Sequence, residues 1–151
     1  MIVFVGTRPG PESLETGHYY SGRSNSFYKH LKQSGFTDIL LLPRQDAKLL
    51  DYGIGLDDVY SNRESLKQRL ESQSPISVCF NSKEALAWFA GMTPRELGDS
   101  WRGAAAKNHV LLAGTKLVWA LPDSSGTARR YHEDRLQLLR ELKDLLSVIC
   151  G

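Results

Sequence analysis

The chain has 151 residues and a mass of 16.9 kDa, a size that suits one compact domain with its own hydrophobic core. Hydrophobic residues make up 41% and charged residues 24%, as in ordinary globular proteins, and no apolar run is long enough to span a bilayer. The net charge of +2 permits binding to nucleic acid without demanding it.

The N-terminal residues and the cysteines indicate where the protein is located and whether it binds a metal. Residues 1–5 are apolar but run straight into a turn, without the basic start or the cleavage site of a signal peptide. We therefore expect a soluble, cytoplasmic monomer that forms a single domain over residues 1–151 and contacts no membrane. Two cysteines, Cys79 and Cys150, are too few for a disulfide framework or a zinc or iron–sulfur site, so we expect no metal and no cofactor.

The first third of the chain predicts a strand, a long loop and a helix. Residues 2–5 are continuously apolar and rich in β-branched side chains, which is typical of a buried parallel strand. Residues 6–25 contain too much Gly, Pro, Ser and Thr for regular structure, yet this loop carries aromatic residues, which indicates a functional site. Ser24 or Asn25 can cap the helix that follows, and Gly35 can end it.

The middle of the chain alternates extended and helical patterns. We expect a short extended piece over residues 39–42, a glycine-punctuated stretch over 52–60, a polar surface helix over 63–71, an apolar strand over 76–80, and a helix over 83–90 capped by Asn81-Ser82 and closed by Gly91.

The last third predicts one more sheet element and a long helix. Residues 93–107 show no clear period and are expected to form a loop, while 110–112 and 117–121 flank a turn in a hairpin-like or bent-strand pattern. A second breaker-rich loop over 122–127 precedes an amphipathic helix over 133–149. The whole order predicts the α/β class: a three-layer α/β/α sandwich with a mostly parallel central sheet, whose ligand site lies at the carboxyl ends of the strands.

Four blocks of residues carry a resemblance to a known family. They are Gly6-Thr7-Arg8-Pro9-Gly10 with Gly17-His18-Tyr19-Tyr20 and Asn25-Ser26-Phe27-Tyr28; Tyr52-Gly53-Ile54-Gly55; Phe80-Asn81-Ser82-Lys83; and Leu121-Pro122-Asp123-Ser124-Ser125-Gly126. In this order they resemble blocks of the mismatch-specific uracil and thymine DNA glycosylases, within the uracil-DNA glycosylase superfamily. The resemblance covers most of the chain, although residues 60–75 look shorter than in relatives, and it implies the same three-layer fold.

The resemblance also implies an activity and roles for single residues. The enzyme would flip a pyrimidine nucleotide out of double-stranded DNA and hydrolyse its base from the sugar. Tyr20 matches the aromatic residue that stacks on the flipped base, and Thr127 matches the tip of the wedge that enters the duplex. The expected base pocket comprises Gly6, Thr7, Pro9, Ser13, His18, Tyr19, Tyr20, Asn25 and Asn81. The expected DNA contacts are Lys83, Ser125, Gly126, Thr127, Ala128 and Arg129.

Arg8 departs from the family pattern. Relatives carry an Asn there, or an Asp in the wider superfamily, which positions the attacking water. An arginine cannot accept a hydrogen bond from that water, so either another group does so or the chemistry is impaired. We expect Asp57 to take this catalytic role first, with Asp58, Glu12 and Asp123 as alternatives. Arg8 itself would stabilise the departing base or bind a phosphate.

The sequence leaves the substrate and even the activity open. Asp123 stands where relatives carry Asn, Ser or His near the base, and a carboxylate that accepts from an exocyclic amine favours a cytosine-type base. The candidates are uracil-like bases and 5-substituted pyrimidines, including the bulky modified cytosines of some phage DNA, in repair or in defence. The rival hypothesis is a non-catalytic reader of DNA or of a modified base. A nucleotide-binding protein is a weaker third, because residues 6–10 lack the dinucleotide and P-loop motifs.

Overall fold

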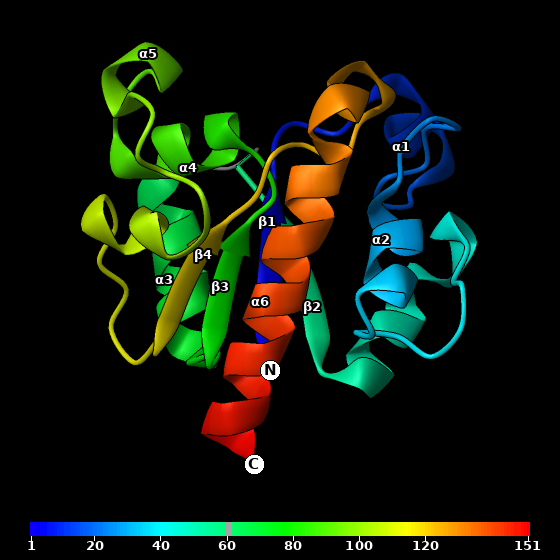
Figure 1. Ribbon diagram of the computed structural model, residues 1–151. Helices are drawn as coiled ribbons and strands as arrows, with labels where there is room; N and C mark the ends of the chain where they lie inside the picture. Colours follow the sequence, from blue (N-terminus) through cyan, green and yellow to red (C-terminus); the bar gives the residue numbers. More distant parts are fainter. Residues whose placement is uncertain (60–61) are drawn as a thin grey trace.

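Parallel strands form the centre of the protein, whose computed structural model describes residues 1–59 and 62–151. Within these residues the sheet has the order β2-β1-β3-β4 and consists of β1 (Ile2–Gly6), β2 (Ile54–Asp58), β3 (Ser77–Phe80) and β4 (Leu117–Ala120). Each neighbouring pair is parallel, and Val5 lies opposite Asp57 on one side and Phe80 on the other (Figure 1). Tyr60 and Ser61, which begin the stretch identified above as short, lie outside the described residues.

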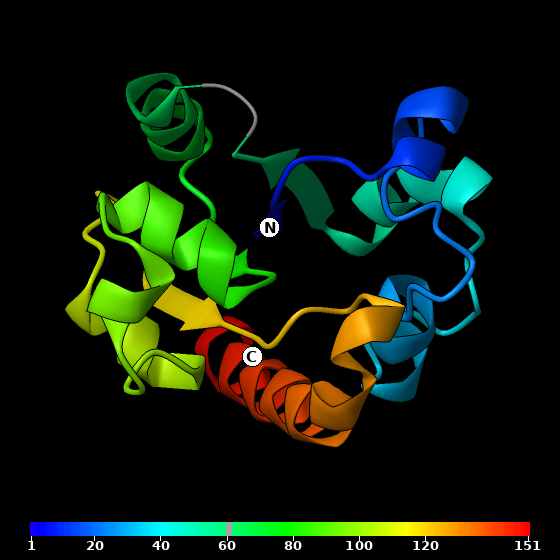
Figure 2. The same ribbon diagram turned by 90° about the horizontal axis from the view of Figure 1, so that it is seen from above.

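Helices cover both faces of the sheet, because successive side chains of each strand point to opposite sides. Val3 and Val5 of β1 pack into one apolar cluster, and Ile2 and Phe4 pack into another. The first cluster, which we call the α4 core, draws its helical residues from α3 (Arg63–Gln73), α4 (Lys83–Ala90), α5 (Pro94–Leu97) and η2 (Gly103–Asn108). The second, the α6 core, draws them from α2 (Phe27–Gln33), η1 (Pro43–Tyr52) and α6 (His132–Cys150). The predicted three-layer α/β/α sandwich is thereby confirmed, and Figure 2 shows α3 and α6 on opposite sides.

The longer helices begin and end close to their predicted bounds. The Ser82 side chain caps α4 by accepting a hydrogen bond from the backbone N–H of Ala85 at 3.1 Å, and Gly91 ends the helix with a φ of 75°. Asn62 caps α3 in the same way, accepting from the N–H of Ser65 at 2.8 Å. Such a cap stabilises a helix by about 1 kcal/mol. Local capping chemistry therefore sets where these helices start.

One strand prediction is wrong, and the sequence pattern does not identify β2. Residues 39–42, expected as a short extended piece, join no strand of the sheet; Leu42 is extended, three of their apolar side chains are 42% to 52% exposed, and Pro43 starts η1 directly after them. Residues 110–112 form no strand either, and β4 pairs in parallel with β3, which excludes a hairpin. The glycine-punctuated stretch contains β2 instead, because Gly53, at a φ of 71°, turns the chain so that it pairs with β1.

Short helices interrupt the segments predicted as loops. They are α1 (Pro11–Thr16), α5, η2 (Gly103–Asn108) and η3 (Gly126–Tyr131). Pro11 occupies the first position of α1, and Gly17 ends that helix with a φ of 74°. Thr93 caps α5 by accepting from the N–H of Glu96 at 3.1 Å. The Pro and Gly residues that argue against regular structure here begin and end a helix, which is their other common use.

The strand order determines where a ligand site can form. From β1 the chain crosses to β2 on one side and then returns to β3 on the other. In parallel sheets a crevice opens outside the carboxyl ends of the strands at such a reversal, and ligands bind there. These ends lie at the top of Figure 1 and toward the viewer in Figure 2. None of the helices in the described part of the chain has the length and apolar composition needed to cross a membrane.

Candidate active site

A pocket of about 610 Å³ opens at the carboxyl ends of the strands. The residues that line it at or just after the four strand ends are Gly6, Asp58, Asn81 and Asp123. Most of the remaining lining comes from within residues 7–25 and from 125–127. These are the two breaker-rich loops that the sequence predicts to carry the site, and they meet around one cavity.

Tyr20 forms a wall of the pocket that fits closely against the end of β1. Its ring stacks on Phe27, with ring centroids 4.0 Å apart and planes 21° from parallel. Its hydroxyl lies 2.6 Å from where a β-carbon on Gly6 would stand, so a larger residue at Gly6 would displace the ring. Tyr20 also has a φ of 55°, which residues other than glycine rarely adopt and which the surrounding contacts must maintain. The ring is therefore held in one orientation at the pocket.

Contacts from η1 and α2 hold residues 18–20 against the domain. Asp46 accepts a hydrogen bond from the backbone N–H of Tyr19 at 3.1 Å and lies 3.2 Å from Nδ1 of His18. The Tyr28 hydroxyl donates to the Tyr19 carbonyl at 2.7 Å. Tyr19 lines the pocket, as expected, whereas His18 is outside its lining and supports the loop from behind.

Three polar atoms near this end of the sheet are buried without a hydrogen-bond partner among the described residues. They are Oη of Tyr20, Oδ1 of Asn81 and Nη2 of Arg135. Asn81 is 2% exposed, and its side-chain nitrogen donates to Oγ of Ser124 at 3.2 Å. An unpartnered buried polar group costs about 1–3 kcal/mol, which a ligand with matching groups would offset. The floor of the pocket thus has hydrogen-bonding capacity that the protein itself does not use.

The segment after β4 packs against the start of α2. The backbone N–H of Ser26 donates to the carbonyl of Ser124 at 2.9 Å. A β-carbon on Gly126 would stand 2.4 Å from the Ser24 side chain and 3.3 Å from its carbonyl oxygen, so only glycine allows this approach. The carboxylate of Asp123 accepts from the N–H two residues later at 3.1 Å, which fixes its orientation. The two loops therefore form one continuous wall.

Two neighbouring carboxylates on β2 have different surroundings. Both oxygens of Asp57 accept from the guanidinium of Arg69 on α3, each at 3.1 Å, and Asp57 does not line the pocket. Asp58 does line it. Successive strand residues point to opposite faces, so only one of the pair can face the cavity. The expected position of Asp57 in the pocket is therefore wrong, and Asp58, Glu12 and Asp123 bring carboxylates there instead.

The other predicted site residues, apart from Arg129, divide between two pockets. The first pocket is lined by Arg8 and by Thr7, Pro9, Ser13, Asn25, Ser125, Gly126 and Thr127. Lys83 and Ala128 line a second pocket, of about 360 Å³, which shares Asp123 with the first. The segment from Gly126 to Ala128 therefore touches both cavities.

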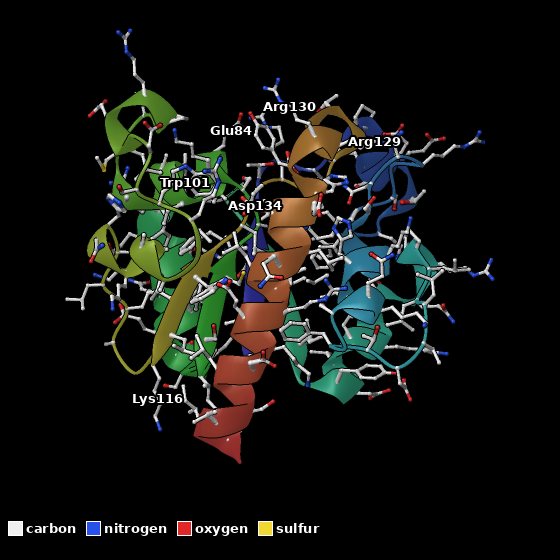
Figure 3. The ribbon with its side chains drawn as sticks, viewed as in Figure 1. Glu84, Trp101, Lys116, Arg129, Arg130 and Asp134 are labelled. Carbon is white, nitrogen blue, oxygen red and sulfur yellow. The ribbon has the colours of Figure 1, made fainter. Side chains whose placement is uncertain are left out.

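Cations occupy the rim at this end of the molecule. Arg129 and Arg130 are exposed, and Figure 3 shows both at the end that also carries Glu84 and Trp101, with Lys116 at the opposite end. The Arg130 guanidinium lies 4.8 Å from the ring centroid of Tyr131. This end can therefore meet a polyanion with charge and aromatic surface together.

Several residues that shape the site lack an obvious sequence signal. Asp46 falls in a segment without a motif, and His30 lies on a helix recognised only by its apolar face. Arg135 does have a signal in hindsight, because it precedes the buried Leu139 and Leu142 by four and seven positions and so occupies an apolar position of α6. A charge on a buried helix face is unusual and marks a specific environment.

The match to known proteins extends over nearly the whole chain. The family model described as Uracil DNA glycosylase superfamily matches residues 1–147, which include all the described strands and both loops of the pocket. Across the described residues, no group of three or more His, Cys, Asp and Glu side chains is arranged to hold a metal ion.

Proposed function

The chain belongs to the Uracil DNA glycosylase superfamily, whose members are DNA glycosylases, and on this premise we propose that it hydrolyses the bond between a pyrimidine base and deoxyribose in double-stranded DNA. Glycosylases reach this bond by flipping the nucleotide out of the duplex into a pocket. The observation that carries the proposal is the cavity of about 610 Å³, which combines an oriented aromatic wall with carboxylates at the strand ends. The products are a free base and an abasic site.

The flipped base stacks on Tyr20, whose ring is held against Phe27. Stacking on an aromatic side chain contributes about 1–3 kcal/mol per base. The unpartnered side-chain oxygen of Asn81 offers a hydrogen bond to the edge of the base. Asn25 shapes the pocket indirectly, since its side chain accepts from the N–H of Phe27 at 3.0 Å and so fixes the start of α2.

The superfamily supports a uracil-like substrate, and Asp123 extends the proposed substrate class to cytosine-type bases. A carboxylate at the pocket accepts from an exocyclic amine, a group that cytosine-type bases carry and uracil lacks. We propose a pyrimidine substrate of the uracil-like or 5-substituted kind, including cytosines with bulky 5-substituents. The second pocket, which meets the first at Asp123, offers room for such a substituent.

A carboxylate at the pocket positions the attacking water, and Asp58 is our first choice because it lines the cavity at the end of β2. As the bond from C1′ of the sugar to the base breaks, its electron pair stays on the base and the sugar becomes cationic. Water then bonds to C1′ and its proton passes to the carboxylate. A nearby negative charge stabilises the cationic sugar, and general-base assistance contributes about 10²–10⁴-fold. Glu12 and Asp123 are the alternative carboxylates.

DNA reaches the pocket along the rim of the carboxyl ends. Residues 125–129 form the wedge, with Thr127 at the tip; within this segment, residues 125–127 line the first cavity and Ala128 lines the second. Arg129 and Lys83 bind backbone phosphates, which attract cations on any sequence. One monomer is sufficient for this arrangement, because a single chain supplies the pocket, the wedge and the cations.

Arg8 favours one alternative, a non-catalytic reader of DNA. It lines the pocket at the position where relatives carry their water-positioning Asn, and it cannot accept a hydrogen bond from water. In an active enzyme, Arg8 donates instead to the departing base or to a phosphate.

A panel of duplexes, each with one uracil, thymine mismatch or 5-substituted cytosine, separates the two functions. Each duplex is incubated with the protein and treated with alkali, which cuts abasic sites, and its binding is measured in parallel. The proposed enzyme yields a strand cut on at least one duplex. Tight binding of one modified base without any cut would overturn the enzyme and establish the reader.

A further inference from the structure

A fully buried arginine lies beneath the carboxyl end of the sheet, in the layer of α2 and α6. Arg135 is 0% exposed; its Nε donates to Nδ1 of His30 at 3.1 Å, and its Nη1 donates to the carbonyl of Pro122 at 2.7 Å. Its Nη2 is buried and has no hydrogen-bond partner within residues 1–59 and 62–151. Among the described ion pairs, none involves this guanidinium. The partners of Arg135 are therefore neutral acceptors rather than a carboxylate.

The hydrogen-bond partners of Arg135 carry no charge, and the Asp123 carboxylate, which forms no ion pair with it among the described residues, offsets its charge only in part. Burial lowers the pKa of Arg135 to about 10, so it remains protonated at neutral pH. Burial, with the charge of Arg135 added to it, lowers the pKa of His30 to about 3, so that ring is neutral. The ring of His132 lies 4.8 Å from that of His30, and burial lowers its pKa as well. Burying an unpaired charge is costly, and a neutral donor could satisfy the same two acceptors. The presence of a charge at this position therefore indicates that the charge itself has a function.

The charge of Arg135 acts on the pocket without lining it. Burial raises the pKa of the Tyr20 hydroxyl, and the guanidinium opposes that shift, so its field reaches this wall. Pro122, whose carbonyl it binds, directly precedes Asp123 of the lining. Cys79 on β3 also lies in its field, but burial raises the pKa of that thiol and keeps it neutral. At Tyr20 the effect of the guanidinium on the pKa exceeds that of the opposing Asp123 carboxylate, so the two charges together favour an anion at this wall.

We propose that Arg135 is a positioning residue for the leaving group: its buried charge favours the pyrimidine anion that departs into the pocket, a role that rests on the proposed function. When the C1′–N bond breaks, the electron pair stays on the base and the negative charge spreads over its ring nitrogens and oxygens. Water supplies the new bond to C1′, and its proton goes to the pocket carboxylate. Arg135 exchanges no proton and does not touch the base. A charge in a poorly screened interior acts beyond contact distance and needs no reorganisation.

The first arm of the test requires no catalysis. Binding of free 5-fluorouracil to the full chain is followed by ¹⁹F NMR from neutral to alkaline pH, across which this base loses a ring proton. The wild type should bind more tightly as the base becomes an anion, and so should Arg140→Met, which removes an exposed arginine of the same helix. Arg135→Met should lose this rise. No binding, no rise in the wild type, or an equal rise in Arg135→Met would overturn the proposal.

The second arm uses single-turnover cleavage of duplexes that contain uracil or 5-fluorouracil. Arg135→Met should cleave uracil up to about 10²-fold more slowly, the lower end of the loss seen when a direct donor to a developing anion is removed. Its loss on 5-fluorouracil should be smaller, because that base is the better leaving group. Arg135→Lys keeps the charge and should keep most of the rate. Equal losses on both bases, or no rescue by a folded Arg135→Lys, contradict the proposal.

The two arms separate this inference from the proposed function. If the wild type releases no base but binds the 5-fluorouracil anion more tightly, and Arg135→Met does not, the proposed activity is refuted and the inference stands. If the wild type releases a base but Arg135→Met matches it in both the binding and the cleavage measurements, the inference is refuted and the proposed activity stands. Thermal unfolding checks that each variant is folded, and if Arg135→Met is not, Arg135→Gln, which removes the charge and keeps a neutral donor, replaces it in both arms.

Discussion

The two helical layers differ in what they bury against the sheet. On the side of the α4 core the buried side chains that pack together are apolar, such as Leu86 and Phe80. On the side of the α6 core, Arg135 and His30 are buried among apolar neighbours. Tyr20, which walls the pocket, also packs against the α6 core. Both layers bury apolar surface, but only the layer with the α6 core places a buried charge near the pocket, where we propose that it acts on the reaction.

The largest expected effect lies at the pocket and uses two adjacent carboxylates as a matched pair. Asp58→Asn should slow single-turnover base release by about 10²–10⁴-fold, because the amide accepts a proton poorly from water. Asp57→Asn should cleave at nearly the wild-type rate and cost at most about 1 kcal/mol in stability, since its partner Arg69 is partly exposed.

The opposite outcome would return the role to Asp57. If Asp58→Asn cleaves normally while Asp123→Asn or Glu12→Gln is inactive, a carboxylate still acts but Asp58 is the wrong one. Normal cleavage by all four variants would remove the carboxylate from the mechanism.

A substitution in the α4 core should lower the stability of the fold without changing the rate of base release. Leu86 is fully buried on α4, so Leu86→Ala should lower the free energy of unfolding by about 2–5 kcal/mol through lost contacts and the cavity left behind. Urea denaturation measures this loss. Single-turnover rates per folded molecule should stay unchanged; a slowed reaction in a fully folded variant would show that this layer also acts on the site.

A substitution of Tyr20, in the pocket, should instead affect the reaction with the flipped base. Tyr20→Ala should weaken productive binding and processing of the flipped base by about 1–3 kcal/mol, or roughly 5- to 150-fold, because stacking acts only after extrusion. Binding to an unmodified duplex, measured by fluorescence anisotropy, should change little. Equal losses in both assays would place Tyr20 outside the base pocket.

The α6 side should also respond to acid in a way that the α4 core does not. His30 titrates near pH 6.5 when unfolded but with a pKa of about 3 when folded, so below pH 6.5 the unfolded state binds the extra proton. The free energy of unfolding should therefore fall with decreasing pH by about 1.4 kcal/mol per unit from this group. His30→Asn keeps an acceptor for Arg135 without titrating and should flatten the curve. Identical pH curves for both proteins would refute the buried neutral histidine.

Much of the fold is predictable from local patterns. The apolar runs at residues 2–5 and 76–80 identify two strands, because β1 and β3 are buried along their whole length. The leucine spacing of 133–149 identifies a helix, because α6 buries one face. β2 is not predictable in this way, since Gly55, Asp57 and Asp58 are typical of a turn. Its extended form depends on pairing with β1, which is a contact between distant parts of the chain.

The sequence predicts which loops form the site, but it does not predict which side chains face the pocket. The glycines, prolines and aromatic residues before Asn25 identify the first loop, and the resemblance identifies the second. Whether Asp57 or Asp58 faces the pocket depends on the register of β2, because a shift of one residue reverses every side chain. The helical periodicity places Arg135 on the apolar face of α6, but its contacts with His30 and Pro122 depend on how α6 packs on the sheet, which joins distant parts of the chain.

The most direct test of the account is the mass of the DNA strand after reaction with the wild-type protein. Each modified duplex of the panel is incubated without alkali, and both the strands and the small-molecule fraction are examined by mass spectrometry. If the protein hydrolyses the base from the sugar, one strand loses the mass of a single pyrimidine base and gains one water, while the free base appears in solution and the backbone remains intact. Strand masses that stay unchanged on every duplex, or a backbone cut without a free base, would contradict it.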